Sequence, residues 1–346
     1  IIEVTGSYGV TLWITLLNVI LYILFQNFNP NKRLGLIYSI LLLGIWFFGN
    51  SRVDDFTDSP SQMSVGILQP NLDPNTKWDY DKKKETIAYM DSLHSVAIAL
   101  DPDIILFPET ALPAYLKLNH RVRKMIQTKV DSSGIPVLTG TVDRVKSSDG
   151  QKHYFNSSMF LTPNHKYVLY NKLHLVPFAE YIPLSGQFPS LMNLNFGQGN
   201  FTQGSEYTVF EWKNVKFSNL ICYESSMPNI VREFIQKGAE IITIQTNDGW
   251  LGETAGPYQH YDVARIRAIE NRVPIIRSAN TGISGLILAN GRSTHEQKLG
   301  ETAVFKVNVP IGNASSFYSR YGDIFAMICF VIFFLLGPLP CLKKRL

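Results

Sequence analysis

Three apolar segments, two near the start of the chain and one near its end, constrain the fold most strongly. The first covers residues 8–28, with few polar interruptions such as Asn18 and Gln26. The second, LGLIYSILLLGIWFF, covers residues 34–48 and carries no charge, and the third covers residues 324–342. Each is close to the length of about 20 residues that an apolar helix needs to cross a bilayer. We therefore predict three membrane-spanning helices, with a long polar region between the second and the third.

Basic residues beside these segments predict how they are oriented. Lys32 and Arg33 lie in the short loop between the first two segments, and residues 343–345 are Lys-Lys-Arg. Loops rich in lysine and arginine remain on the cytoplasmic side of a membrane. Three crossings satisfy both constraints and place the polar region, residues 51–323, on the outer side.

Composition excludes several classes of protein. Charged residues make up 17% of the chain, below the usual quarter or so, because the two ends are apolar. The net charge is +4 and no long basic run occurs, so we predict no nucleic-acid partner. Cys222, Cys329 and Cys341 are too few and too badly spaced for a disulfide framework. The chain begins with Ile1, not with methionine, and we expect it to be a fragment or a processed chain.

The rest of the sequence alternates between strand and helix patterns. We divide the chain into membrane helices (1–50), a linker (51–63), a catalytic domain (64–322) and a C-terminal membrane helix with a basic tail (323–346). Predicted helices cover 76–100, the surroundings of 122–125, a segment opening at 227–228, and 258–271. Predicted strands cover 64–69, 103–107, 136–142, 153–161, 166–170, 207–212, 215–221, 240–245, 274–278 and 285–289. This alternation is typical of an α/β domain with a mixed sheet and helices over its faces.

Cys222 is the first candidate for chemistry. It follows the predicted strand 215–221, and Met227 and Pro228 open a predicted helix shortly afterwards. Amides at the start of a helix favour an anion, so this position predicts a lowered thiol pKa and a usable nucleophile. The alternative is a small buried hydrophobic residue, which is the usual role of a single cysteine.

Three charged residues are candidates for partners of this thiol. Glu109 directly follows the apolar strand IILFP and is either a general base or an acid at the start of a helix. Lys172 lies in the apolar sequence NKLHLVPFAEYIP, where it either stabilises an oxyanion or remains a surface lysine. Glu180, in the same sequence, either pairs with a neighbouring cation or lies at the rim of the site.

Other catalytic patterns receive less support. The histidines show no metal-binding spacing, so we predict no metal site and no cofactor. His174 and His260 remain alternative partners for a Cys–His pair.

Residues 173–204 have little periodicity, and a loop of that length usually forms a lid or a binding element. Its apolar residues could enter lipid or pack on the domain; they are Phe178, Phe188, Leu191, Met192 and Phe196.

Three of these motifs, taken in order, resemble a known catalytic triad. Glu109 in FPET, Lys172 in NKLHLVPFAEYIP and Cys222 in ICYES are similar to the Glu–Lys–Cys triad of the carbon–nitrogen hydrolase (nitrilase) superfamily. The motifs QPNLDPNTKW, TNDGWLG and HYDVARIRAIENRVPIIRSANTGISG, together with the membrane segments, resemble the apolipoprotein N-acyltransferase family. The resemblance extends over nearly the whole chain, although that family usually has additional N-terminal helices.

The resemblance implies a fold and a location. It implies a four-layer α-β-β-α nitrilase-like sandwich domain, flanked by transmembrane helices and lying on the periplasmic side of a bacterial inner membrane. It also implies that Glu109 is the general base, that Lys172 stabilises the oxyanion and that Cys222 is acylated. Supporting residues would be Glu180, Tyr223 and Glu224, and lipid-binding residues Trp78 and Phe178, with simple packing as the alternative for Trp78.

The resemblance also implies a reaction. An acyl chain would pass from a membrane phospholipid to the Cys222 sulfur and then to the N-terminal amine of a diacylglyceryl-apolipoprotein, in a ping-pong sequence. Two alternatives remain open. One is a membrane-anchored amidase that uses the same triad on a small C–N substrate, and the other is a non-enzymatic scaffold of the cell envelope.

Overall fold

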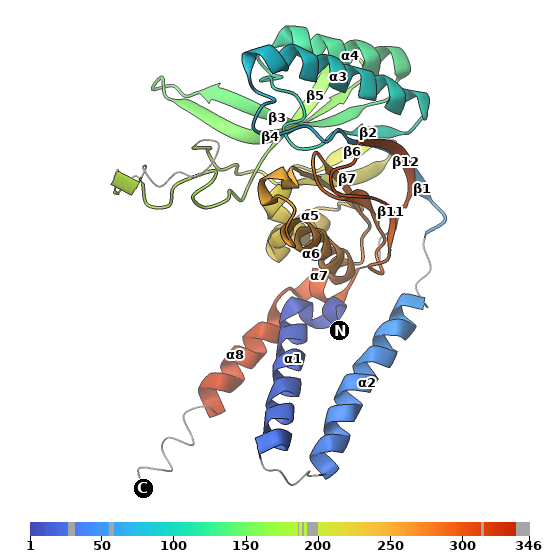
Figure 1. The fold of residues 1–346 in the computed structure, drawn as a ribbon, viewed down its shortest axis with the longest axis vertical. Helices are drawn as coiled ribbons and strands as arrows, with labels where there is room; N and C mark the ends of the chain where they lie inside the picture. The colour runs from blue at the N-terminus through green and yellow to red at the C-terminus, as the bar shows by residue number, and fades with distance from the viewer. Residues whose placement is uncertain are drawn as a thin grey trace.

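Two mixed β-sheets form the centre of the polar region (Figure 1). The computed structural model describes residues 1–26, 32–54, 59–185, 187–188, 190–191, 200–312 and 315–336. The first sheet has the order β12 (Ala303–Pro310), β1 (Gln62–Gln69), β2 (Ile104–Leu106), β3 (Val137–Lys146), β4 (Lys152–Thr162) and β5 (Lys166–Asn171). The second has the order β11 (Ser293–Gln297), β10 (Ser284–Ile287), β9 (Ile275–Ala279), β8 (Ile241–Thr246), β7 (Val215–Ile221) and β6 (Phe210–Trp212).

Parallel strands lie at the centre of each sheet. In the first sheet β1, β2 and β3 are parallel, and β12, β4 and β5 add antiparallel pairings on either side. In the second sheet β7, β8 and β9 are parallel, and β6, β10 and β11 complete it by antiparallel pairings. Open α/β sheets place their sites just beyond the carboxyl ends of such parallel strands.

Helices cover the outer face of each sheet. The helices α3 (Tyr80–Ala99) and α4 (His120–Ser133) lie over the first sheet, and α5 (Pro228–Gln236) and α6 (Gly256–Asn271) lie against the second (Figure 1). The α5 sequence forms a helix readily because proline occupies its first position, where no amide donor is required. Its apolar residues Ile230, Val231 and Phe234 recur at helical spacing and are buried.

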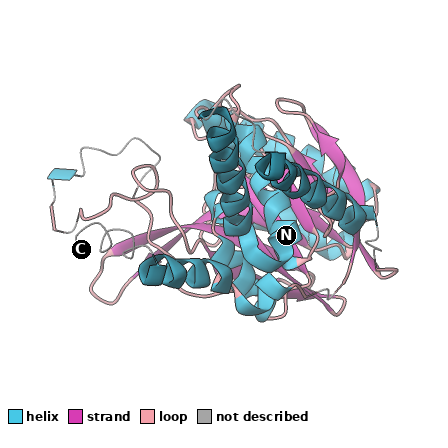
Figure 2. Cartoon of the chain, turned by 90° about the horizontal axis from the view of Figure 1, so that it is seen from below, coloured by secondary structure: helices cyan, strands magenta, loops and turns pink. Residues whose placement is uncertain are grey.

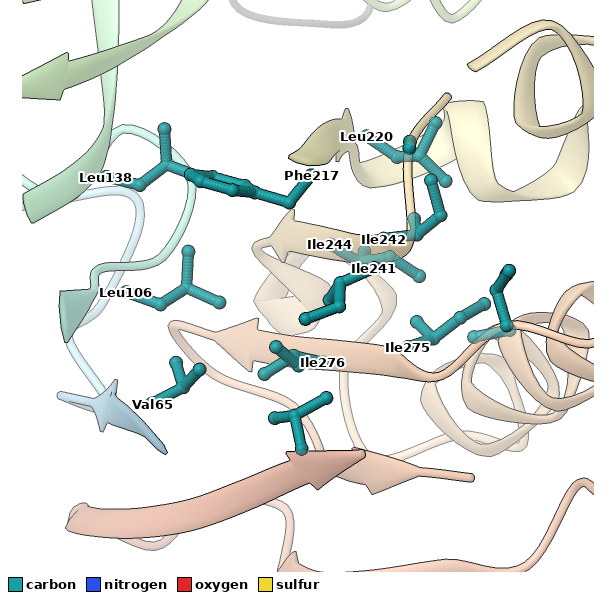
Figure 3. Packing of buried hydrophobic residues seen from close by; sticks show 14 of the residues in the cluster. Val65, Leu106, Leu138, Phe217, Leu220, Ile241, Ile242, Ile244, Ile275 and Ile276 are labelled. Carbon is teal, nitrogen blue, oxygen red and sulfur yellow. The ribbon is translucent and has the colours of Figure 1, made fainter. Parts of the chain in front are cut away.

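The space between the two sheets is mostly apolar. Figure 3 shows Leu106 and Leu138 of the first sheet facing Phe217 of the second. All three side chains are buried and belong to one continuous hydrophobic core. The strands that carry the candidate residues therefore stand on a packed and rigid base.

Several buried polar side chains within this layer join the two sheets, among them Asn219, Ser278 and Gln245. Gln245, on β8, donates from Nε2 to the carbonyl oxygens of Phe107 (2.7 Å) and Leu138 (3.1 Å). Its Oε1 accepts hydrogen bonds from Asn219 and Ser158. A buried amide that satisfies all these partners fixes the relative position of the strand ends.

The terminal helices project from one side of the sheet domain (Figures 1 and 2). They are α1 (Ile2–Gln26), α2 (Lys32–Asp54) and α8 (Ile324–Leu336). By length and composition, α1 and α2 are able to cross a membrane, and few of their side chains are buried within the protein. Residues 337–342 of the third predicted segment and the basic residues 343–345 lie outside the described residues.

The first helix is attached to the sheet domain near its start. At Gly6 the backbone has φ 63°, and a Cβ there would lie 2.6 Å from the Tyr318 ring of α7 (Phe317–Tyr321). The Ser7 amide donates to Oε1 of Glu270 at the end of α6 (3.1 Å). A glycine thus allows both the turn and the close contact.

Every predicted strand and helix of the polar region is present, most of them with shifted ends. Helix α3 begins at Tyr80, not at residue 76, and β6 begins at Phe210, not at residue 207. The strands β11 and β12 and the short helix α7 were not predicted. β12 pairs with β1 over residues 62–69, a partner distant in sequence, so its place depends on tertiary contacts that no local pattern reveals.

Candidate active site

Glu109, Lys172 and Cys222 come together beyond the ends of three strands. Lys172 directly follows β5, Cys222 directly follows β7, and Glu109 comes three residues after the end of β2. Glu109 and Lys172 are 8% and 1% exposed, and Cys222 is partly accessible. The charges of Glu109 and Lys172 both act on the Cys222 thiol, so the three residues share one electrostatic environment.

Two further residues join the carboxylate to the lysine. Asn156, on β4, donates from Nδ2 to Glu109 Oε1 (2.8 Å) and to Glu180 Oε1 (2.9 Å). Glu180 in turn pairs with Lys172, whose Nζ lies 2.9 Å from Oε1 and 2.8 Å from Oε2. The Lys172 amide also donates to the Asn156 carbonyl (2.8 Å). These contacts hold the base candidate and the cation in fixed relative positions.

Burial and neighbouring charges set the protonation of the carboxylate and the lysine. Burial raises the pKa of Glu109, while the positive charge of Lys172 opposes that rise. Burial by itself would lower the pKa of Lys172, but the negative charges of Glu109 and Glu180 outweigh it and raise the pKa above its ordinary value. Lys172 is therefore held as a cation, and the pKa of Glu109 lies above that of an exposed carboxyl, which makes it a stronger proton acceptor when it is ionised.

The predicted lowering of the Cys222 pKa is wrong. Burial and the carboxylate of Glu109 raise the pKa of the thiol to about 12, although Lys172 opposes them. The physical reason is that Cys222 does not lie at the start of an α-helix. It begins a 3-10 turn, Cys222–Ser226, and α5 starts only at Pro228. The resting side chain is thus a thiol, which has to lose its proton to a base when it attacks.

The backbone at Cys222 adopts an unusual conformation. Its φ is 52°, in the left-handed region that residues with a side chain seldom occupy. Such a conformation costs on the order of 1–3 kcal/mol and persists where surrounding contacts enforce it. The Cys222 carbonyl oxygen lies 2.9 Å from Ser225 Oγ, which donates to it, and 3.1 Å from His260 Nε2.

Glu224 connects the cysteine turn to the lysine segment. It is fully buried, and its Oε1 accepts from the amides of Leu173 (2.6 Å) and His174 (3.1 Å) and from the Tyr170 hydroxyl (2.7 Å). Its Oε2 accepts from the Ile221 amide (2.7 Å). Burial raises the pKa of Glu224 to about 7, against the effect of Lys172 and these donors. The carboxyl group therefore fixes the distance between two segments that carry candidate residues.

The other predicted residues lie at or near the surface. Tyr223 is half-buried. Trp78 is 36% exposed, and its ring meets the edge of Tyr115 with centroids 6.5 Å apart. Phe178 is 44% exposed, with a φ of 64° and an amide that donates to the Tyr181 carbonyl (2.7 Å). These positions are compatible both with lipid contact and with packing.

The predicted lid is described only in part. Residues 173–185 form turns, with a single bridge between Pro177 and Tyr181. At the far end of the loop, the amide of Gly204 donates to the Lys172 carbonyl (2.8 Å), so both ends of the loop are fixed at the lysine. Leu184 and Phe188 are exposed, whereas Met192 and Phe196 lie outside the described residues.

Sequence reasoning missed Lys77 and Asn156. Lys77 is 3% exposed, and its Nζ donates to Thr110 at both the carbonyl oxygen (3.0 Å) and Oγ1 (2.8 Å). Burial lowers the pKa of Lys77 to about 8, although the charge of Glu109 opposes this. The only indication of Lys77 in the sequence was its position next to Trp78 in the QPN…KW motif. Asn156 gave no signal except that it is a polar residue within a predicted strand.

Chains of known families are similar to this one. A model of the carbon–nitrogen hydrolase family matches residues 64–309. Two similar curated proteins are apolipoprotein N-acyltransferases. The one from Geobacter metallireducens is 32% identical over 95% of this chain and 64% of that protein. The one from Chlorobaculum tepidum is 32% identical over 99% of this chain and 70% of that protein. The chain thus spans about two thirds of the length of these relatives.

Solved structures share the fold. A variant of a nitrilase-superfamily amidase from Nesterenkonia has a TM-score of 0.55 at 18% identity, covering 72% of this chain and 91% of that one. Another variant of the Nesterenkonia amidase, with a covalent addition at its active-site cysteine, has a TM-score of 0.56 at 16% identity, covering 80% of this chain and all of that one.

From the family model, the relatives and the fold together, this chain belongs to the carbon–nitrogen hydrolase family, and within it to the apolipoprotein N-acyltransferases.

Proposed function

We propose that this protein transfers an acyl chain from a membrane phospholipid to the N-terminal amine of a diacylglyceryl-apolipoprotein, the last step of bacterial lipoprotein maturation. One observation carries the proposal. In a chain whose curated relatives are named apolipoprotein N-acyltransferase, a buried carboxylate and a buried ammonium both act on one partly buried cysteine.

In the first half-reaction, Cys222 attacks the carbonyl carbon of a phospholipid ester. Glu109 accepts the thiol proton, the S–C bond forms, and the C–O bond of the ester then breaks. Glu109 returns the proton to the leaving lysophospholipid, and the acyl group remains on sulfur as a thioester. The ammonium of Lys172 supports the transient oxyanion. The raised pKa of Cys222 supports a role for Glu109 in this step, because a thiol that is protonated at rest needs a base beside it.

In the second half-reaction, the α-amine of the lipoprotein attacks the thioester carbonyl. A C–N bond forms, the C–S bond breaks, and the amine proton passes by way of Glu109 to the sulfur. Water competes with the amine for the thioester, so the site has to exclude it. The loop over 173–204 is the natural lid, since it is fixed at Lys172 and exposes Leu184 and Phe188. In this proposal Glu180, Tyr223 and Glu224 support the triad, and Trp78 and Phe178 contact lipid.

The proposal includes an architecture and a location. The sheet domain, residues 64–322, is an α-β-β-α sandwich of four layers on the periplasmic side of the inner membrane. It is joined through the linker 51–63 to the membrane helices of residues 1–50 and is followed by the C-terminal helix and basic tail of residues 323–346. The apolar character of α1 and α2 supports this arrangement. Withdrawing an acyl chain from a bilayer costs about 0.8 kcal/mol per CH₂, which favours a site held at the membrane surface.

The test is the intact mass of purified protein after incubation with phospholipid vesicles. We expect an increase equal to one fatty acyl group on the wild type and none on Cys222→Ala. Addition of a diacylglyceryl-cysteine peptide should then remove the adduct and produce the N-acylated peptide. Ammonia release from small amides, without a phospholipid-derived adduct, would instead favour a membrane-anchored amidase. Full complementation of a cell lacking the enzyme by Cys222→Ala would favour a non-enzymatic scaffold.

A further inference from the structure

A chain of buried polar contacts links strand β9 to the main chain of Cys222. Arg277, on β9, donates from Nη2 to Asp248 Oδ2 (2.6 Å), and Thr246 donates to Asp248 Oδ1 (3.0 Å). Nδ1 of His260, on α6, lies 2.8 Å from the same Oδ1. Its Nε2 lies 3.1 Å from the carbonyl oxygen of Cys222. The chain therefore ends on the peptide group that follows the proposed nucleophile.

This chain is rigid and charged. Asp248 and Arg277 are 1% and 0% exposed. Burial by itself would raise the pKa of Asp248, but the charge of Arg277 and the hydrogen bond from His260 hold it at about 2. Asp248 is thus an anion that only accepts hydrogen bonds. His260 Nδ1 also lies 3.1 Å from Arg277 Nη2, and Nε2 lies 2.9 Å from Ser225 Oγ, so a proton on Nε2 is shared between Ser225 Oγ and the Cys222 oxygen.

Fixing the Cys222 carbonyl also fixes the next amide. The peptide bond is planar and trans, so the Cys222 C=O and the Tyr223 N–H point in opposite directions. Ser225 Oγ donates to the same carbonyl (2.9 Å), and two donors on one oxygen prevent this peptide from rotating. The left-handed φ of 52° at Cys222 likewise persists only where surrounding contacts enforce it.

We propose that the Arg277–Asp248–His260 chain, together with Ser225, positions the Cys222–Tyr223 peptide so that the Tyr223 N–H donates to the oxyanion formed during acylation. His260 is then a positioning residue, which acts through the Cys222 carbonyl and not as the base of a Cys–His pair. The inference rests on the proposed role of Cys222 as nucleophile, but it holds for any acyl donor.

Two reactions of the same sulfur separate this role from a general structural one. With p-nitrophenyl butyrate, the thiol proton passes to Glu109, an S–C bond forms through an oxyanion, and p-nitrophenolate leaves. With iodoacetamide, the thiol proton again passes to Glu109, an S–C bond forms and iodide leaves, without any oxyanion. A residue that serves only the oxyanion donor affects the first reaction and not the second.

The experiment uses the whole protein in detergent and compares wild type with His260→Leu, His260→Gln and Ser225→Ala. The p-nitrophenolate burst measures acylation, and mass spectrometry of the Cys222 peptide measures alkylation. Removing an oxyanion donor costs on the order of 10²–10³ in rate, so we expect His260→Leu to slow the burst at least about 10-fold. Alkylation should remain close to the wild-type rate.

His260→Gln, whose amide can donate to the same carbonyl, should recover most of the burst, and Ser225→Ala should show a smaller loss. His295→Gln, at an exposed histidine, is the matched control and should behave as wild type.

Two results would overturn the inference. Equal losses of acylation and alkylation in His260→Leu would mean that His260 merely supports the fold, and an unchanged burst would mean that it has no role. The proposed function can be refuted without refuting this positioning role. If the wild type gives a burst that His260→Leu slows, but forms no adduct from phospholipid, the positioning role stands while the phospholipid donor does not.

Discussion

Adding a single methyl group at Gly140 should displace the proposed base. Gly140 lies on β3, directly against the segment that carries Glu109. A Cβ at this position would lie 2.4 Å from the Thr110 amide nitrogen, 2.6 Å from the Pro108 oxygen and 2.7 Å from the Glu109 Cα. All three are backbone atoms, so no side chain can rotate away to make room.

The size of the effect follows from these distances. Ordinary contacts of a Cβ begin at 3.4 Å, so the strand or the Glu109 segment has to move by about 1 Å. Overpacking of this kind costs about 1–3 kcal/mol of stability, which leaves a domain with 5–15 kcal/mol still folded. A displacement of about 1 Å at a reacting group costs on the order of 100-fold in rate, equivalent to about 2.7 kcal/mol in the activation barrier.

The assay is the p-nitrophenolate burst of Gly140→Ala together with its thermal unfolding. Gly312→Ala is the control, because its Cβ would meet only the Ser59 side chain at an ordinary 3.6 Å. We expect the burst of Gly140→Ala to fall about 100-fold while the protein stays folded, and the control to match wild type. A variant with wild-type burst and wild-type stability would show that this contact does not determine the position of Glu109.

Four further predictions concern the buried polar groups. Asn156→Leu removes the donor that Glu109 and Glu180 share, so it should destabilise the protein by about 1–3 kcal/mol; an unchanged melting temperature would contradict this. In Glu224→Gln, either orientation of the amide turns its NH₂ group toward a backbone N–H donor. This should lower the free energy of unfolding by a similar amount, measured by thermal unfolding. Unchanged stability would show that the four donors are not needed. Glu109 has to be ionised to accept a proton and its pKa is raised, so the burst rate should decline with falling pH from a point above the ordinary carboxyl value of 4.5. Lys77→Met removes a cation that lowers this pKa and should move the decline to higher pH; an unmoved profile would exclude the influence of Lys77.

Local patterns predicted most of the elements, because burial leaves a periodic signature in the sequence. The alternating and apolar runs identified β1 to β10, and helical spacing identified α3 to α6. The edge strand β11 was missed because its sequence STHEQ is polar and half-exposed. The edge strand β12 was missed although Phe305, Val307 and Val309 alternate with polar residues, as in a half-buried strand. Strand ends also indicated Glu109, Lys172 and Cys222, because polar residues directly after a buried strand stand out against their surroundings.

The positions that link these residues were beyond the reach of sequence reasoning. Asn156 bridges two carboxylates, one 47 residues before it and the other 24 residues after it, and nothing in β4 indicates either partner. The reactivity of Cys222 was likewise misjudged. A helix was predicted at the right place, but the six residues from Cys222 to the start of α5 separate its amides from the sulfur.

Residue type and spacing along the chain were enough to predict the apolar helices, the alternating order of the strands and the three candidate chemical groups. The protonation of those groups and the direction of the Cys222 peptide depend on the folded arrangement. A pKa and a hydrogen bond depend on the charges and donors that surround an atom in space, and here these come from both sheets and from segments far apart in the chain.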